Sequence, residues 1–164
     1  MQRSPRKVLT AVAALAAGAV AIAVFLQFAF GMEPCAWCTF QRLIFLAVAA
    51  AALLAASLYR SRPAFVAAGG LAALLAAGGI WAALYQQFVA SKADSCVYTF
   101  ADRFLLRTGL DEKLPWLFEA TASCADANVP LLGVSFAFWS AALFAVLLLL
   151  TAAALRGGTG RASA

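Results

Sequence analysis

The chain has 164 residues, of which 65% are hydrophobic and only 12% are charged, and its mean hydropathy is +0.92. This composition excludes an ordinary water-soluble globular domain and is typical of a membrane protein. The net charge of +5 does not indicate nucleic-acid binding, because the basic residues flank the apolar runs and are better explained by orientation in a lipid bilayer.

Four stretches without any charged residue follow one another along the chain, and they are 25, 17, 29 and 29 residues long. A helix needs about 20 apolar residues to cross a bilayer, and an open sheet edge cannot be satisfied in lipid. The sequence therefore predicts an all-α membrane protein, a four-transmembrane-helix bundle that forms one domain over residues 1–164. The expected spans are about 8–30, 40–59, 64–90 and 131–155.

The first stretch has the basic start of a signal peptide, with Arg3, Arg6 and Lys7 before it. A signal peptide needs an apolar core of only about 7–15 residues, which is much shorter than this stretch. We therefore expect the first stretch to remain in the protein as a spanning helix.

The charges are divided unevenly between the two sides of the expected bundle. The N-terminal tail, the turn at 60–62 and the C-terminal tail hold seven Arg or Lys and no acid, whereas all seven Asp and Glu fall on the other side. Because basic residues concentrate on the cytoplasmic side, we expect both termini in the cytoplasm. A short first loop at about 31–39 and a long second loop at about 91–130 then face outward.

The first outer loop leads into MEPCAWCTFQRLIF, in which Cys35 and Cys38 are separated by two residues. A disulfide in such a pair closes a very small ring and removes little chain entropy, so it is a poor structural staple. Short C-x-x-C pairs commonly serve redox exchange instead. The other two cysteines, Cys96 and Cys124, lie in the long loop, where a disulfide is either structural or redox-active.

Arg42 follows Cys38 by four residues, so on a helix the two side chains share one face. A guanidinium there favours a thiolate at Cys38 and can polarise the carbonyl oxygen of a lipid-soluble acceptor. The alternative is an ordinary interfacial anchor that extends to the lipid headgroups.

The electron acceptor has to be found outside the chain. No flavin or haem motif is visible, and no acidic residue or histidine lies in any expected span, so a proton path across the bilayer is unsupported. No metal is expected either, because the second cysteine pair is 28 residues apart and lacks its own C-x-x-C. Two thiols that become a disulfide release two electrons and two protons, which a membrane quinone accepts.

The order of these features resembles the DsbB family, bacterial inner-membrane proteins that generate disulfides. The resemblance rests on four spans, a C-x-x-C pair in the first outer loop, an arginine four residues after it, and two cysteines in a larger second outer loop. The segment ASCADANVPLLGVSF also resembles the family, although it lacks the tryptophan expected there. Gln41 stands where some members carry an acid.

The resemblance implies a thiol:quinone oxidoreductase whose redox sites face the periplasm. A DsbA-like periplasmic thiol oxidase, which is thioredoxin-like, would form a mixed disulfide with Cys96 of a Cys96–Cys124 pair. Cys35 and Cys38 would re-oxidise that pair, and Cys38 would pass the electrons to ubiquinone or menaquinone beside Arg42. The alternatives are a non-catalytic four-span scaffold with structural disulfides and a relative of vitamin K epoxide reductase, in which the C-x-x-C comes late in the bundle.

Two further features of the sequence concern access to the site. Leu114, Trp116, Leu117 and Phe118 are bunched before Cys124, and this short amphipathic piece rests on the membrane surface or forms a small loop core. Gln86 and Gln87, near the outer end of the third span, either line a quinone pocket or lie at the membrane interface.

Overall fold

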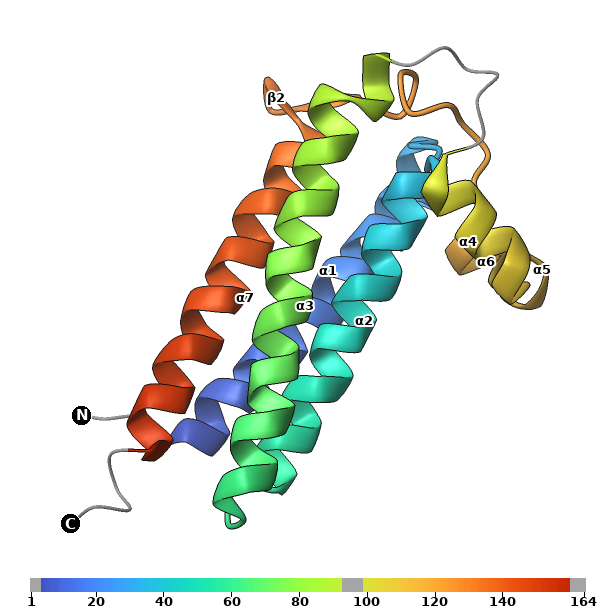
Figure 1. Cartoon of the computed structure of the whole chain (residues 1–164). Helices are drawn as coiled ribbons and strands as arrows, with labels where there is room; N and C mark the ends of the chain where they lie inside the picture. Colours follow the sequence, from blue (N-terminus) through green and yellow to red (C-terminus); the bar gives the residue numbers. More distant parts are fainter. Residues whose placement is uncertain (1–3, 93–98, 160–164) are drawn as a thin grey trace.

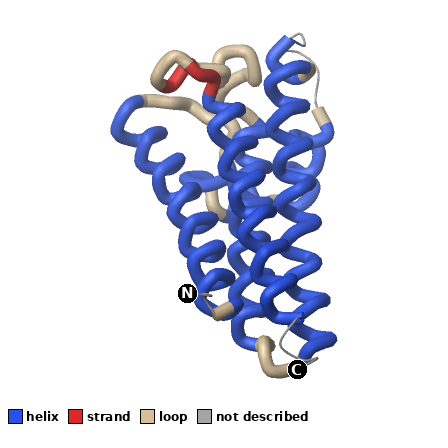
Figure 2. Tube along the Cα trace, turned by 90° about the vertical axis from the view of Figure 1, so that its left-hand side faces the viewer, coloured by secondary structure: helices blue, strands red, loops and turns tan. Residues whose placement is uncertain are grey.

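Four long helices form the body of the protein in the computed structural model, which describes residues 4–92 and 99–159. Each is long and apolar enough to cross a membrane, so the predicted four-helix membrane class is confirmed. Figures 1 and 2 show them side by side in an elongated bundle, with the first and last described residues at the same end. These helices are α1 (Pro5–Phe30), α2 (Ala36–Ser57), α3 (Arg62–Phe88) and α7 (Phe136–Thr159).

The short elements lie at the end of the bundle away from the termini (Figure 1). Helices α4 and α6 pack against α2, and a two-stranded hairpin precedes α7. The elements in chain order are the 3-10 turn η1 (Ala90–Lys92), α4 (Phe100–Thr108), α5 (Leu110–Lys113), α6 (Pro115–Phe118), β1 (Pro130–Leu131) and β2 (Val134–Ser135).

Small residues let the long helices approach one another closely. Helix α3 packs on both α2 and α7, and its buried positions are mostly alanine and glycine. Gly79 faces the ring of Phe144, which stacks in turn on Phe45 with the ring centroids 3.8 Å apart. Because lipid provides no hydrophobic force between helices, this close packing is what stabilises the bundle.

Gly79→Ala is expected to lower the free energy of unfolding by about 1–3 kcal/mol. An added Cβ would lie 2.4 Å from an atom of the Phe144 ring, which is fully buried and held by its stacking on Phe45. Gly78→Ala is the matched control, since a Cβ there meets no atom within 4 Å. Unfolding by denaturing detergent measures both variants, and equal stability of the two would contradict this packing.

Helix α7 begins at Phe136, five residues later than the expected start of the fourth span. The intervening segment folds back as the hairpin, in which Leu131 pairs with Val134. The two residues between them, Leu132 and Gly133, have φ of 54° and 79°, the positive values of a tight hairpin turn. Hydropathy does not distinguish this apolar hairpin from the first turn of a helix, which is why the sequence placed the span too early.

Helix α2 begins at Ala36, four residues before the expected start of the second span. Cys35 caps the helix, because its sulfur accepts a hydrogen bond from the backbone N–H of Cys38. Both cysteines of the C-x-x-C pair are therefore positioned by the helix start and not by a free loop.

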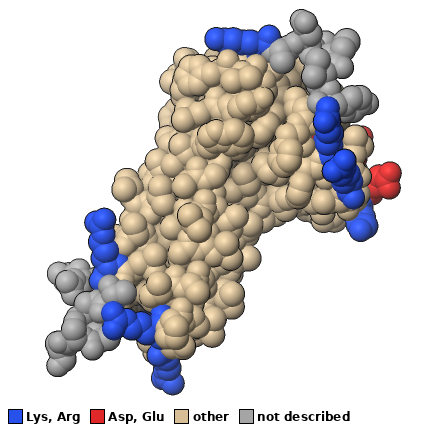
Figure 3. All heavy atoms as spheres, viewed as in Figure 1, with Lys and Arg blue, Asp and Glu red and all other residues tan. Residues whose placement is uncertain are grey.

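The acidic side chains lie at one end of the bundle, whereas Lys and Arg lie at both ends. On the face seen in Figure 3, the end that carries the termini shows Lys and Arg without acids, and the acidic groups lie near the short helices. The basic residues described at the first end are Arg6, Lys7, Arg60, Arg62 and Arg156. The predicted orientation, in which the end without acids is cytoplasmic, stays a prediction.

Candidate active site

The C-x-x-C pair lies where the first loop enters α2. Cys35 is fully buried, Cys38 is partly exposed, and their sulfurs are 3.0 Å apart and share a hydrogen bond. This distance is longer than the roughly 2.05 Å of a disulfide but short enough for one to form with a small shift. The structure therefore shows the pair as two thiols that are placed to form one bond.

The second loop brings Cys124 to the same place. The backbone N–H groups of Thr121 and Ala122 donate to the carbonyl oxygen of Pro34, at 3.0 and 3.2 Å, which fixes the segment before Cys124 on the first loop. Cys124 lies close enough to Cys35 and to the backbone N–H of Trp37 for both groups to affect its pKa. The sulfur contacts therefore run from Cys124 to Cys35 and on to Cys38.

Cys96 lies outside the described residues, which end at Lys92 and resume at Thr99. Its predicted pairing with Cys124, and its predicted reaction with a soluble partner, stay predictions.

The contact between Cys35 and Cys124 drives their pKa values apart. Hydrogen bonds with Cys124 and with Cys38, together with burial, raise the pKa of Cys35 well above its ordinary value. The hydrogen bond from Cys35 lowers the pKa of Cys124, with help from the N–H of Trp37 and against the effect of burial. The lowered pKa favours the thiolate form at Cys124 over Cys35, and its predicted role as a redox-active cysteine stays a prediction.

Arg42 is buried inside the bundle, with 6% of its surface exposed. Its Nη1 donates to Oε1 of Gln27 on α1 at 2.8 Å and to the carbonyl oxygen of Leu117 in α6 at 3.0 Å. A guanidinium held in this way does not extend to lipid headgroups, so the interfacial-anchor alternative is wrong. Sequence reasoning missed Gln27, since a single glutamine in a long apolar run carries no pattern.

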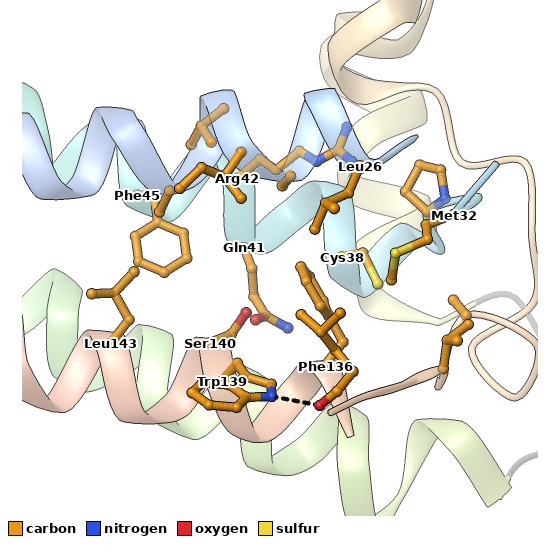
Figure 4. A pocket seen from close by; sticks show the side chains of 18 of the residues that line it. Leu26, Met32, Cys38, Gln41, Arg42, Phe45, Phe136, Trp139, Ser140 and Leu143 are labelled. Atoms are coloured by element: carbon orange, nitrogen blue, oxygen red, sulfur yellow. Dashed lines mark hydrogen bonds between the residues drawn. The ribbon is translucent and has the colours of Figure 1, made fainter. Parts of the chain in front are cut away.

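Cys38 and Arg42 line one cavity between α1, α2 and α7 (Figure 4). Its volume is about 210 Å³, several times the roughly 30 Å³ that one water molecule occupies in the liquid. The walls are mainly apolar, with Phe45 on α2 and Leu143 on α7, and the polar groups gather near the cysteine end. An apolar cavity with a few convergent polar groups is typical of a small-molecule site.

The hairpin before α7 lines the cavity at its outer end. The indole Nε1 of Trp139 donates to the carbonyl oxygen of Leu131 at 3.1 Å, the bond drawn dashed in Figure 4. The hydroxyl of Ser135 is hydrogen-bonded to the side-chain amides of Gln87 on α3 and of Asn128. These contacts attach the hairpin to two of the spanning helices.

The two glutamines singled out in the third span have different surroundings. Gln86 is buried, lines the cavity and donates from Nε2 to the sulfur of Cys38 at 3.1 Å. Gln87 contacts Ser135 of the hairpin instead. Gln86 therefore lines a cavity and Gln87 contacts the hairpin, and the prediction that a quinone occupies this cavity stays a prediction.

The apolar cluster before Cys124 has two faces. Leu117 and Phe118 of α6 are buried against α2, whereas Trp116 is 53% exposed and Leu114 is 38% exposed. The first two form the loop core that was one alternative for this segment. The exposed pair is of the kind that rests on a membrane surface, and that part stays a prediction.

In the described part of the chain, no three Cys, Asp or Glu residues are grouped as metal ligands.

Known proteins similar to this chain carry one recurring name. The family model described as "Disulfide bond formation protein DsbB" matches residues 5–154. Disulfide bond formation protein B of Ralstonia nicotianae is 32% identical over 152 residues, which cover 92% of this chain and 93% of that protein. The protein of the same name from Chromobacterium violaceum is 35% identical over 137 residues, 82% of each chain. Disulfide bond formation protein B 2 of Pseudomonas aeruginosa is 36% identical over 146 residues, 85% of this chain and 83% of that protein.

Proposed function

The chain belongs to the DsbB family of disulfide bond formation proteins, and from this premise we propose that it is a thiol:quinone oxidoreductase that re-oxidises a DsbA-like periplasmic disulfide donor. Membership makes it a disulfide-forming oxidoreductase of the bacterial inner membrane, with four spanning helices. The observation that carries the proposal is the line of contacts from Cys124 through Cys35 to Cys38, which ends at the cavity beside Arg42.

Oxidation of the partner begins at a Cys96–Cys124 disulfide. A thiolate of the partner attacks Cys96, forms a mixed disulfide and releases Cys124 as a thiolate. The partner's second thiol then attacks its own half of the mixed disulfide, so that the partner leaves oxidised and Cys96 becomes a thiolate. The lowered pKa of Cys124 supports this step, because a good leaving group is a stable thiolate.

Cys124 next passes the electrons to the C-x-x-C pair. Its thiolate attacks Cys35 in a Cys35–Cys38 disulfide, which forms a Cys35–Cys124 bond and releases Cys38. Attack of Cys96 on Cys124 then restores the loop disulfide and leaves Cys35 and Cys38 reduced. The contact of Cys124 with Cys35 supports this order. It is held by the hydrogen bonds from the segment before Cys124 to the carbonyl oxygen of Pro34.

The cavity suits a quinone as the electron acceptor. Its apolar walls fit an isoprenoid quinone such as ubiquinone or menaquinone, and a guanidinium suits a carbonyl oxygen. A bound quinone accepts two electrons and two protons, which balances the oxidation of the partner's two thiols. The described hydrogen bonds of Arg42 are made by Nη1, so Nη2 and Nε are the donors left for such a ligand.

The orientation of the bundle is part of the same proposal. The basic end that carries both termini lies in the cytoplasm, and the cysteine end lies at the periplasmic face. The position of the acidic side chains at the cysteine end supports this orientation.

Arg42→Met is expected to raise the KM for quinone by roughly 10-fold or more, because one charge-assisted hydrogen bond to the acceptor is lost. The initial rate of quinone reduction at several quinone concentrations measures it. Arg42→Lys keeps the charge but not the paired donors, so its KM for quinone should fall between those of the parental protein and of Arg42→Met. The unfolding midpoint of each variant shows whether loss of the contacts to Gln27 and Leu117 changes the fold. An unchanged KM and kcat in folded Arg42→Met protein would remove Arg42 from the acceptor site.

A further inference from the structure

Two buried side-chain amides form a chain that ends on the sulfur of Cys38. Gln86 of α3 is 2% exposed and donates from Nε2 to Sγ of Cys38 at 3.1 Å. Gln41 of α2 is 3% exposed and donates from its own Nε2 to Oε1 of Gln86. Both glutamines line the same cavity as Cys38.

The direction of each hydrogen bond in this chain has a chemical consequence. A thiolate only accepts hydrogen bonds, so a neighbouring amide stabilises it through the NH₂ end and opposes it through the carbonyl end. The Oε1 of Gln86 is taken by the NH₂ of Gln41, which turns the NH₂ of Gln86 toward the sulfur. In a water-poor interior such a bond to a charged acceptor is stronger than in solvent.

We propose that Gln86 is a catalytic hydrogen-bond donor to the Cys38 thiolate and that Gln41 is a positioning residue that keeps the Gln86 amide in its donating orientation. The proposal deepens the proposed function and rests on it, since Cys38 matters here as the sulfur beside the acceptor. The same donor serves two steps: it stabilises Cys38 when Cys124 displaces it from Cys35, and it holds the thiolate in place at the cavity. Arg42 contributes its charge from a different side of the cavity, through α1 and α6 contacts that do not involve the amides.

A purely structural role predicts something different. Buried glutamines also hold helices together in membranes, and Gln41 and Gln86 link α2 to α3. Their loss would then lower the stability of the bundle without changing the ionisation of Cys38. The reactivity of the Cys38 sulfur therefore distinguishes the catalytic role of the two glutamines from a purely structural one.

The test uses protein in which Cys35, Cys96 and Cys124 are replaced by Ser, so that Cys38 is the one thiol. Its rate of alkylation by iodoacetamide is measured at pH 7 and at a pH high enough to ionise every thiol, with neither quinone nor partner present. Gln86→Met, which keeps length and removes the donor, is expected to slow alkylation about 10-fold at pH 7 and to leave the high-pH rate unchanged. Gln87→Met is the matched control on the same helix, because Gln87 contacts the hairpin and not the sulfur; it should alkylate at the parental rate.

The role of Gln41 is read from a double-mutant comparison. Gln41→Met should slow alkylation at pH 7 by a smaller factor than Gln86→Met, since the Gln86 amide then turns between its two orientations. The double variant should be no slower than Gln86→Met alone, because Gln41 acts only through Gln86. Gln41→Met also keeps the proposal testable if Gln86→Met fails to fold.

Parental alkylation rates at pH 7 in folded Gln86→Met or Gln41→Met protein would overturn the proposal and leave the amides as helix contacts. An equal slowing at both pH values would also overturn it, since that result reports access to the sulfur and not its ionisation. Failure of the proposed function would be seen elsewhere, as absence of quinone reduction by the unaltered protein.

Discussion

A Cys38→Ser variant should reduce quinone at least roughly 10³-fold more slowly than the parental protein. Among the described cysteines, Cys38 is the one that lines the cavity, and its sulfur is the end of the contacts that start at Cys124. A serine hydroxyl cannot form the disulfide with Cys35 or supply a thiolate to the acceptor. The absorbance of quinone, followed with a reduced DsbA-like partner as the electron donor, measures the rate.

The comparison requires that Cys38→Ser protein remains folded, which its unfolding midpoint shows. The variant should also fail to accumulate a covalent adduct with the partner on non-reducing electrophoresis. Quinone reduction at the parental rate would show that the proposed path through the C-x-x-C pair is wrong.

A Cys124→Ser variant should accumulate a covalent adduct with the partner through Cys96. Removal of Cys124 leaves Cys96 unable to re-form its own pair, and thiol–disulfide exchange passes through a mixed disulfide that only a second thiol resolves. The partner used here lacks its own resolving cysteine. Its remaining reactive cysteine is first converted to a mixed disulfide with a small aromatic thiol. Attack by the Cys96 thiolate then forms the adduct and releases that thiol, so the coloured product and non-reducing electrophoresis report the same event.

The matched control is the double variant Cys96→Ser/Cys124→Ser, which retains the C-x-x-C pair. It should release little of the aromatic thiol, because Cys35 is buried and Cys38 faces the cavity. An equal amount of adduct in the double variant would assign the partner contact to the C-x-x-C pair and contradict the separate roles of the two pairs.

The class of fold could be predicted because it is encoded locally. Four uncharged stretches predict four spans in any arrangement of the helices, and the C-x-x-C spacing and Arg42 are visible without knowledge of their neighbours. The predicted ends of the spans were less accurate where a hairpin and a helix would have the same hydropathy. The start of α7 is the clearest case, since the hairpin at Leu131 and Val134 is as apolar as a helix would be.

The parts of the site that the sequence did not predict are contacts between distant segments. The family resemblance implied that the two cysteine pairs meet, but nothing in the sequence marks Thr121, Ala122 and Pro34 as the backbone partners that hold Cys124 beside Cys35. Gln27 and the amide chain from Gln41 to Cys38 depend in the same way on how α1, α2 and α3 are packed. A polar residue in an apolar run indicates that it has a partner but does not identify the partner.

The central claim is that the two electrons taken from the partner's thiols reach a quinone through this chain. It is tested most directly by an oxygen-free reaction of the unaltered protein with reduced DsbA-like partner and quinone, in which quinol and partner disulfide are counted together. The account predicts one quinol for each partner disulfide formed, and no quinol when the partner is omitted or already oxidised. Partner disulfide that forms without quinol, or quinol that forms without partner thiols, would contradict it.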